Sequence, residues 1–174
     1  DYGRAIDQAL RGLKVEPEHF KLRLYLARGL QKAGRTSDLL RAEQVFRSMP
    51  RDEDYRVALG LAETVERLGI AKSDAAKSVR AGQRYTNATD LAARADQLES
   101  EAQAAWQESI ELYKDALSLV PGDAEILNGI TSSIEKPVRS LRVILLVLAR
   151  RTANPKLVPR VRVQTVTILK NLNK

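Results

Sequence analysis

The sequence predicts an all-α fold in which antiparallel helix pairs stack as a right-handed helical-repeat solenoid, closed by a C-terminal helical cap. Two similar apolar stretches, 9–19 and 112–123, each run into a proline about a hundred residues apart. Two other segments, 26–34 and 61–69, match each other at an offset of 35 residues. Ala and Leu dominate the apolar residues and only 5% of the chain is aromatic, a composition that favours helices.

The spacing of these matches indicates a repeat. Placing Pro17 on Pro121 is a shift of 104 residues, and it also places Ile6 on Ile110. Three periods of about 34–35 residues cover that shift, and periods near 34 with two helices each are typical of a tetratricopeptide array. We therefore expect 9–19 and 112–123 to belong to equivalent second helices, three repeats apart.

On these residues the chain resembles tetratricopeptide-repeat proteins with degenerate repeats. The first-helix pattern of that family is matched by Leu26-Ala27-x-x-Leu30 and Leu61-Ala62-x-x-Val65, with Ala where the family has glycine. The second-helix pattern is matched by three sets of residues: Ala5, Ala9 and Pro17; Ala42 and Phe46; and Ser109, Tyr113 and Pro121. Small residues let paired helices approach closely, and proline ends the second helix.

Residues 1–130 are expected to form these repeats, starting inside a repeat at its second helix, so that further helices are expected to precede Asp1 in a larger chain or complex. Leu26, Ala27, Leu61 and Ala62 are predicted to be buried between helices. Residues 35–40 look like an insertion before the second helix of the second repeat. The second helix of the third repeat is expected near 74–85.

A long helix is predicted near 89–120, because this segment lacks Gly and Pro and has apolar or small residues spaced 4 and 3 apart over four heptads. The alternative is a helix hairpin that turns near 99–103. Leu112 and Leu119 are expected in the core. The stripe consists of Leu91, Ala95, Leu98, Ala102, Ala105, Ser109, Leu112, Ala116 and Leu119.

The C-terminal segment differs in charge from the rest. Residues 136–174 contain ten of the 29 Lys and Arg residues and no acid, which leaves 19 basic against all 22 acidic residues in 1–135. We expect 131–174 to form a basic helical pair that caps the array, since a solenoid needs its last apolar face covered; a strand hairpin is the alternative. The predicted surface patch comprises Arg139, Arg142, Arg150, Arg151, Arg160 and Arg162.

Few residues could support catalysis or metal binding. The chain has no Cys and one histidine, His19, which excludes thiolate chemistry, histidine triads and multi-histidine metal sites. The stretch 29–36 approaches a phosphate-binding loop, but Arg35 replaces the lysine and no strand precedes it. We therefore expect no enzyme activity, cofactor or metal. The longest apolar run, 143–149, is too short to cross a bilayer, so no membrane span is expected.

The predicted function is a non-enzymatic protein–protein interaction scaffold. The family resemblance implies that the first helices line a concave groove, and the basic row in 21–32 predicts an acidic protein or peptide partner. Nucleic-acid binding through the basic C-terminal segment ranks below this, because 136–174 contains no aromatic residue. Self-assembly is the third possibility. The predicted groove residues are Lys21, Leu24, Arg28, Gln31, Lys32, Arg56, Glu63 and Arg67, with Leu59 and Glu66 beside them.

Overall fold

The computed structural model describes residues 2–82 and 89–135. Residues 1–133 form one compact unit and 134–174 a second, and the fold of the first is described here. Every regular element in the described ranges is an α-helix and none is a strand, which confirms the all-α prediction. The predicted basic helical pair at 131–174 lies outside the described residues, apart from 131–135.

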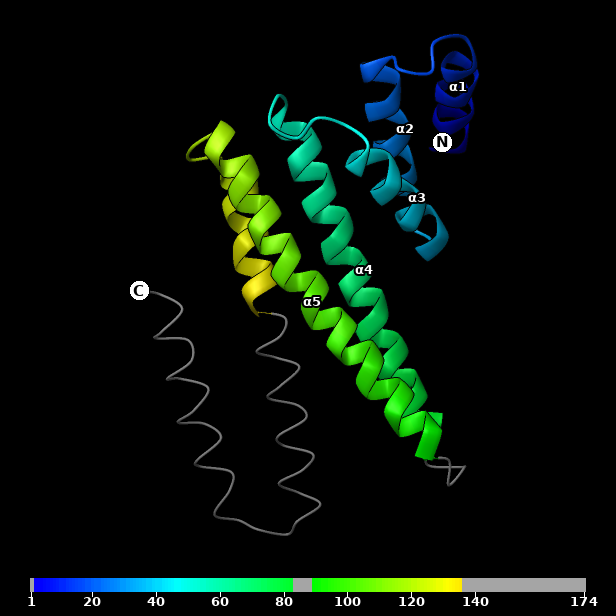
Figure 1. Cartoon of the computed structure of the whole chain (residues 1–174), viewed down its shortest axis with the longest axis vertical. Helices are drawn as coiled ribbons and strands as arrows, with labels where there is room; N and C mark the ends of the chain where they lie inside the picture. The colour runs from blue at the N-terminus through cyan, green and yellow to red at the C-terminus, as the bar shows by residue number, and fades with distance from the viewer. Residues whose placement is uncertain (1, 83–88, 136–174) are drawn as a thin grey trace. The chain divides into compact units, whose positions relative to one another are not determined.

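Five helices are followed by a sixth helical segment (Figure 1). Each of the five packs against the next along the chain, and α2 also contacts α4. Within the first unit, residues 124–133 of the sixth segment lie against α4 and α5, as the hydrogen bonds from Ser132 to Glu66 and between Ser109 and Ser133 show. The elements are α1 Tyr2–Val15, α2 Phe20–Ala33, α3 Thr36–Arg47, α4 Tyr55–Gly82, α5 Thr89–Leu119 and the segment 124–135.

Local capping residues explain where the helices begin and end. His19 precedes α2, and its Nδ1 accepts a hydrogen bond of 3.3 Å from the Leu22 amide. Gly34 ends α2 with φ of 78°, a left-handed conformation that glycine adopts without steric cost. Asp123 begins the sixth segment, because its Oδ1 accepts from the amides of Glu125 and Ile126 at 2.8 and 3.1 Å.

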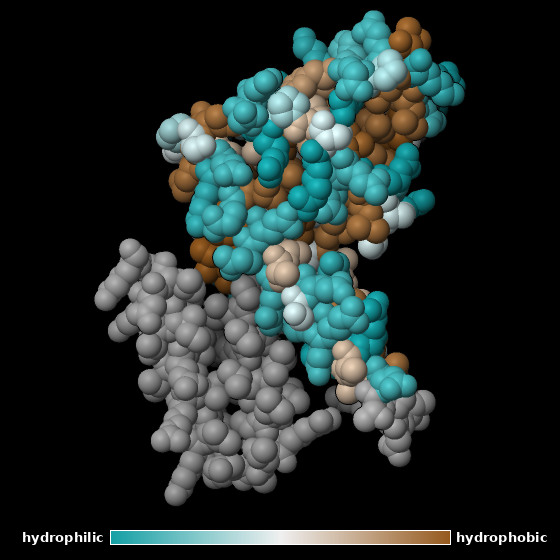
Figure 2. All heavy atoms as spheres, viewed as in Figure 1, coloured by the Kyte–Doolittle hydropathy of each residue, from teal (hydrophilic) through white to brown (hydrophobic). Residues whose placement is uncertain are grey.

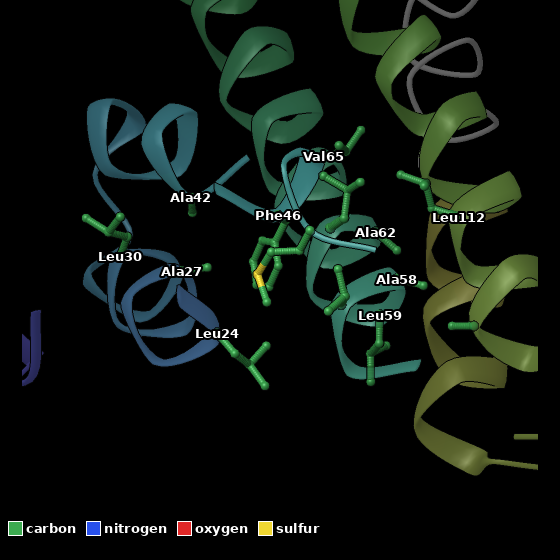
Figure 3. Close-up of a cluster of buried hydrophobic side chains, with 14 of the residues drawn as sticks. Leu24, Ala27, Leu30, Ala42, Phe46, Ala58, Leu59, Ala62, Val65 and Leu112 are labelled. Atoms are coloured by element: carbon green, nitrogen blue, oxygen red, sulfur yellow. The ribbon is translucent and has the colours of Figure 1, made fainter. Parts of the chain in front are cut away.

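The core lies between α2, α3, α4 and α5 (Figure 3). Phe46 of α3 occupies its centre, with Ala27 and Ala42 on one side and Val65 on the other. Small residues let the backbones approach, and a Cβ added at Gly60 would lie only 2.4 Å from the Phe46 ring. All four residues predicted from the 35-residue offset are buried, namely Leu26, Ala27, Leu61 and Ala62.

The prediction of a separate helix near 74–85 was wrong. Helix α4 continues without a break through 74–82, so 70–82 and 89–104 form the outer halves of one long α4–α5 hairpin. Gly69 does not end a helix as Gly34 does: its φ is not positive, and the Trp106 indole lies against it, within 2.8 Å of where a Cβ would be. Residues 70–104, about one 35-residue period of the 104-residue shift, therefore extend the α4–α5 hairpin and do not form the expected third helix pair.

Helix α5 is continuous from Thr89 to Leu119, as the long-helix interpretation expected. Its stripe faces α4 at Ala95, Leu98, Ala102 and Leu112, all buried. The prediction that Leu119 lies in the core was wrong. Leu119 is the last residue of α5, and it is 41% exposed. The predicted insertion at 35–40 is also wrong, since α3 begins at Thr36.

The surface of the described residues is largely hydrophilic in the view of Figure 2, with hydrophobic side chains gathered near α1 and α2. Ala9 is the only buried residue of α1, and this helix packs mainly against α2. Tyr2 and Val15 of α1 are exposed. The basic side chains of α2 are separate from these residues of α1 and are described below.

Candidate partner-binding face

A row of polar and aromatic side chains runs along α2. Lys21, Tyr25, Arg28 and Lys32 lie within about 60° of one another around the helix axis, since successive residues are 100° apart. Lys21, Tyr25 and Lys32 are exposed and Arg28 is partly buried. Tyr25 was not predicted as a site residue, although it falls four residues after Lys21. We name this row, with its neighbours Arg56, Glu63 and Arg67 on α4, the α2–α4 face.

The aromatic ring in this row is accessible: Tyr25 is 63% exposed. Arg56 lies across the face from Tyr25. The pKa of Arg56 is raised mainly by its hydrogen bond to Asp54, and electrostatic interactions with Tyr55 and Tyr25 also raise it. An exposed tyrosine beside cationic side chains offers both apolar contact and a hydrogen-bonding hydroxyl, which are common at protein interfaces.

A polar network ties the two helices of the face together. Arg28 donates 2.7 and 3.1 Å hydrogen bonds to Glu63 Oε2 and Gln31 Oε1. Gln31 Nε2 donates to the Gly60 carbonyl, Glu63 Oε2 and Thr64 Oγ1, at 3.1, 2.9 and 3.2 Å. Arg67 donates to the Gln31 carbonyl. These bonds fix the spacing between α2 and α4.

Two predicted groove residues lie beneath the face and not on it. Leu24 and Gln31 are 5% and 2% exposed, so neither can contact a partner in this conformation. Leu59 and Glu66 are buried in the same way. The remaining predicted residues lie on the α2–α4 face, where the structure brings α2 and α4 side by side: Lys21, Arg28, Lys32, Arg56, Glu63 and Arg67.

The face keeps positive charge after its internal ion pairs are formed. Arg28 pairs with Glu63 at 2.7 Å, and Arg56 pairs with Asp54 at 2.6 Å. The Arg56 bond is also the main reason that the pKa of Asp54 is lowered. Within the described residues, Lys21, Lys32 and Arg67 make no ion pair. Lys21 and Lys32 are therefore without an ion-pair partner on the same row as Tyr25, and Arg67 lies near the C-terminal end of α2, where it donates to the Gln31 carbonyl.

A shallow recess of about 420 Å³ lies at one end of the face, where the loop before α4 meets the end of α5. Arg56 belongs to both the face and the recess, and Leu119 supplies an exposed apolar wall. The recess is lined by Glu53, Asp54, Tyr55, Arg56, Leu119 and Val120.

A second polar cluster is buried between α4, α5 and the sixth segment. The Tyr113 hydroxyl donates to Glu66 Oε2 at 2.7 Å, and the Ser132 hydroxyl donates to Glu66 Oε1 at 3.0 Å. Burial, and then Glu66, raise the pKa of Tyr113 well above its ordinary value. With Glu66 and Tyr113 almost inaccessible, this cluster holds helices together.

The α2–α4 face offers cationic side chains, one carboxylate and an aromatic ring. No group of three or more potential metal-ligating side chains occurs in the described ranges. The side chains of the α2–α4 face could bind a ligand through charge, hydrogen bonds and an aromatic surface. The predicted basic patch from Arg139 to Arg162 lies outside the described residues.

Comparison with known proteins gives no relative: no protein-family model, curated protein or solved structure matches this chain.

Among the helices of the described residues, none combines the length and the apolar character needed to cross a membrane.

Proposed function

We propose that this chain is a non-enzymatic scaffold of the tetratricopeptide-like helical-repeat type, and that its α2–α4 face binds an acidic segment of a partner protein. The equivalent burial of Leu26-Ala27 and Leu61-Ala62, 35 residues apart, supports the relation between α2 and α4. The contact between α2 and α4 supports a stacked arrangement of first helices. In such an array the first helices form the extended binding surface.

The observation that carries the proposal is the exposed Tyr25 set between the uncompensated charges of Lys21 and Lys32 on α2. Acidic side chains of a partner would lie near the lysines, while an apolar side chain would pack on the tyrosine ring. From Lys21 to Lys32 the helix rises about 16 Å, the length of about five extended residues. The face therefore suits a short acidic segment with one apolar residue.

A displayed library of random peptides, selected against the full chain, tests this function. We expect enrichment of Asp and Glu around an apolar residue, and loss of that enrichment with the variant Lys21→Ala/Tyr25→Ala/Lys32→Ala. The control Tyr2→Ala/Lys77→Ala/Lys114→Ala removes one exposed tyrosine and two exposed lysines elsewhere and should preserve it. Equal enrichment on the α2 variant and the wild-type chain would contradict the proposal.

Nucleic-acid binding is the second candidate, supported by the ten Lys and Arg residues and absence of acid in 136–174. Phosphate contacts release counterions, so such binding would weaken steeply with salt. Titration of the chain with double-stranded DNA or single-stranded RNA at several salt concentrations measures this slope. Tight binding at physiological salt would favour the nucleic acid over the acidic protein partner.

A further inference from the structure

One carboxylate is already bound on the α2–α4 face. Oε2 of Glu63 accepts hydrogen bonds from Arg28 at 2.7 Å and from Gln31 Nε2 at 2.9 Å. Both donors come from α2 and lie three residues apart, so one turn of α2 binds one carboxylate supplied by α4. The arrangement has the chemistry expected for recognition of an acidic side chain.

The two donors differ in accessibility. Gln31 is buried and also donates to Gly60 and Thr64, so its position does not depend on Glu63. The side chains of Arg28 and Glu63 are 28% and 23% exposed, so their ion pair reaches the surface. Ion pairs that water reaches contribute little net free energy, which allows one carboxylate to replace another.

We propose that Glu63 is an internal competitor for the partner's carboxylate, and that an acidic partner segment displaces it from Arg28. This proposal rests on the proposed function. Lys21 and Lys32 flank Arg28 and make no internal ion pair, so they bind acidic residues without displacing anything. Glu63 thereby sets selectivity: a segment must carry enough acidic residues to engage the lysines before Arg28 changes partners.

Replacement of Glu63 by a partner carboxylate at Arg28 would leave the contact between α2 and α4 in place. Gln31 keeps its hydrogen bonds to Gly60 and Thr64, and Arg67 keeps its bond to the Gln31 carbonyl. Glu63 is free to turn toward solvent, because it is only partly buried. The competitor thus affects affinity for acidic ligands more than it affects stability.

Glu63→Gln in the full chain tests this proposal, because the amide can still accept from Arg28 and Gln31 but carries no charge. The probe is a fluorescent six-residue peptide of four glutamates, one leucine and one glycine. We expect Glu63→Gln to tighten binding by about two- to fivefold, the range for replacing an accessible ion pair. Glu18→Gln is the matched control: it removes the same charge and releases Arg23 of α2, which lies off the face. It should change affinity less than Glu63→Gln.

The outcomes separate the two proposals. If the wild-type chain binds the probe through Lys21 and Lys32 but Glu63→Gln and Glu18→Gln have equal affinities, the competitor role is wrong and the proposed function stands. If affinity is unchanged by Lys21→Ala/Lys32→Ala, the α2–α4 face itself is not the site. A fall in melting temperature for Glu63→Gln without tighter binding would assign Glu63 to stability alone.

Discussion

The Tyr113 hydroxyl on α5 donates a 2.7 Å hydrogen bond to Glu66 on α4, 47 residues earlier in the chain, and both side chains are buried. Ser132 donates to the other oxygen of the same carboxylate. A buried carboxylate requires such donors, since water cannot replace them. Glu66 therefore joins three helical segments at one point.

Removing the Tyr113 hydroxyl should destabilise the fold. Tyr113→Phe takes one donor from the buried Glu66 carboxylate, and we expect the free energy of unfolding to fall by about 1–3 kcal/mol. Urea unfolding measures this. Tyr25→Phe is the control, because Tyr25 is largely exposed, and it should change stability by less than about 0.5 kcal/mol. Equal effects of the two variants would contradict the role of Glu66 given above.

The same residue predicts how stability varies at alkaline pH. The pKa of Tyr113 in the folded chain is raised above its ordinary value, which is about 10. Between these two pKa values the unfolded state loses the proton and the folded state keeps it, so the unfolded state binds fewer protons. The contribution is therefore fully present below about pH 10 and is lost as pH rises toward the folded pKa.

Urea midpoints from pH 9 to 11 test this sign. The midpoint should fall with rising pH more steeply in the wild-type chain than in Tyr113→Phe, which retains the other ionisable groups. Parallel curves for the two proteins would show that Tyr113 ionises alike in the folded and unfolded states.

Two leucines of the α5 stripe should respond differently to truncation. Leu112 is 3% exposed and Leu119 is 41% exposed. Leu112→Ala should cost about 2–5 kcal/mol through lost burial and a cavity, whereas Leu119→Ala should cost less than about 1 kcal/mol. Chemical unfolding of both variants gives the comparison. Similar costs would mean that Leu119 is as well covered as Leu112.

The close contact between α3 and α4 depends on Gly60. A Cβ there would lie 2.4 Å from the ring of Phe46, which is fully buried. Gly60→Ala should therefore destabilise the fold by about 1–3 kcal/mol, despite the better helix propensity of alanine. Gly82→Ala, with no neighbour within 4 Å of its added Cβ, should be neutral or mildly stabilising in a thermal melt. Equal melting temperatures for the two variants would contradict this packing.

The burial of Leu26-Ala27 and Leu61-Ala62 could be predicted from sequence, because the same local pattern recurs at an offset of 35 residues. The long α4–α5 hairpin could not be predicted from sequence. Gly34 and Gly69 look equivalent in sequence, yet Gly34 adopts a left-handed conformation and ends α2, while Gly69 packs beneath Trp106 inside α4. That difference depends on a residue 37 positions later, which no local pattern reveals.

The candidate face was predictable only in part. The basic row of Lys21, Arg28 and Lys32 follows from helical spacing, but spacing does not show which charges are neutralised. Glu63 satisfies Arg28 across a helix contact, and Gln31 is buried by the same contact. Tyr25 could have been found from its position in the row.

A nuclear magnetic resonance titration of the isotope-labelled full chain with the six-residue acidic peptide tests the central claim most directly. We predict that the amide signals of Lys21, Tyr25, Arg28 and Lys32 on α2 shift together as peptide is added, with one common affinity. Shifts confined to residues 136–174, with the α2 signals unchanged at saturation, would contradict the assignment of the α2–α4 face as the partner-binding surface.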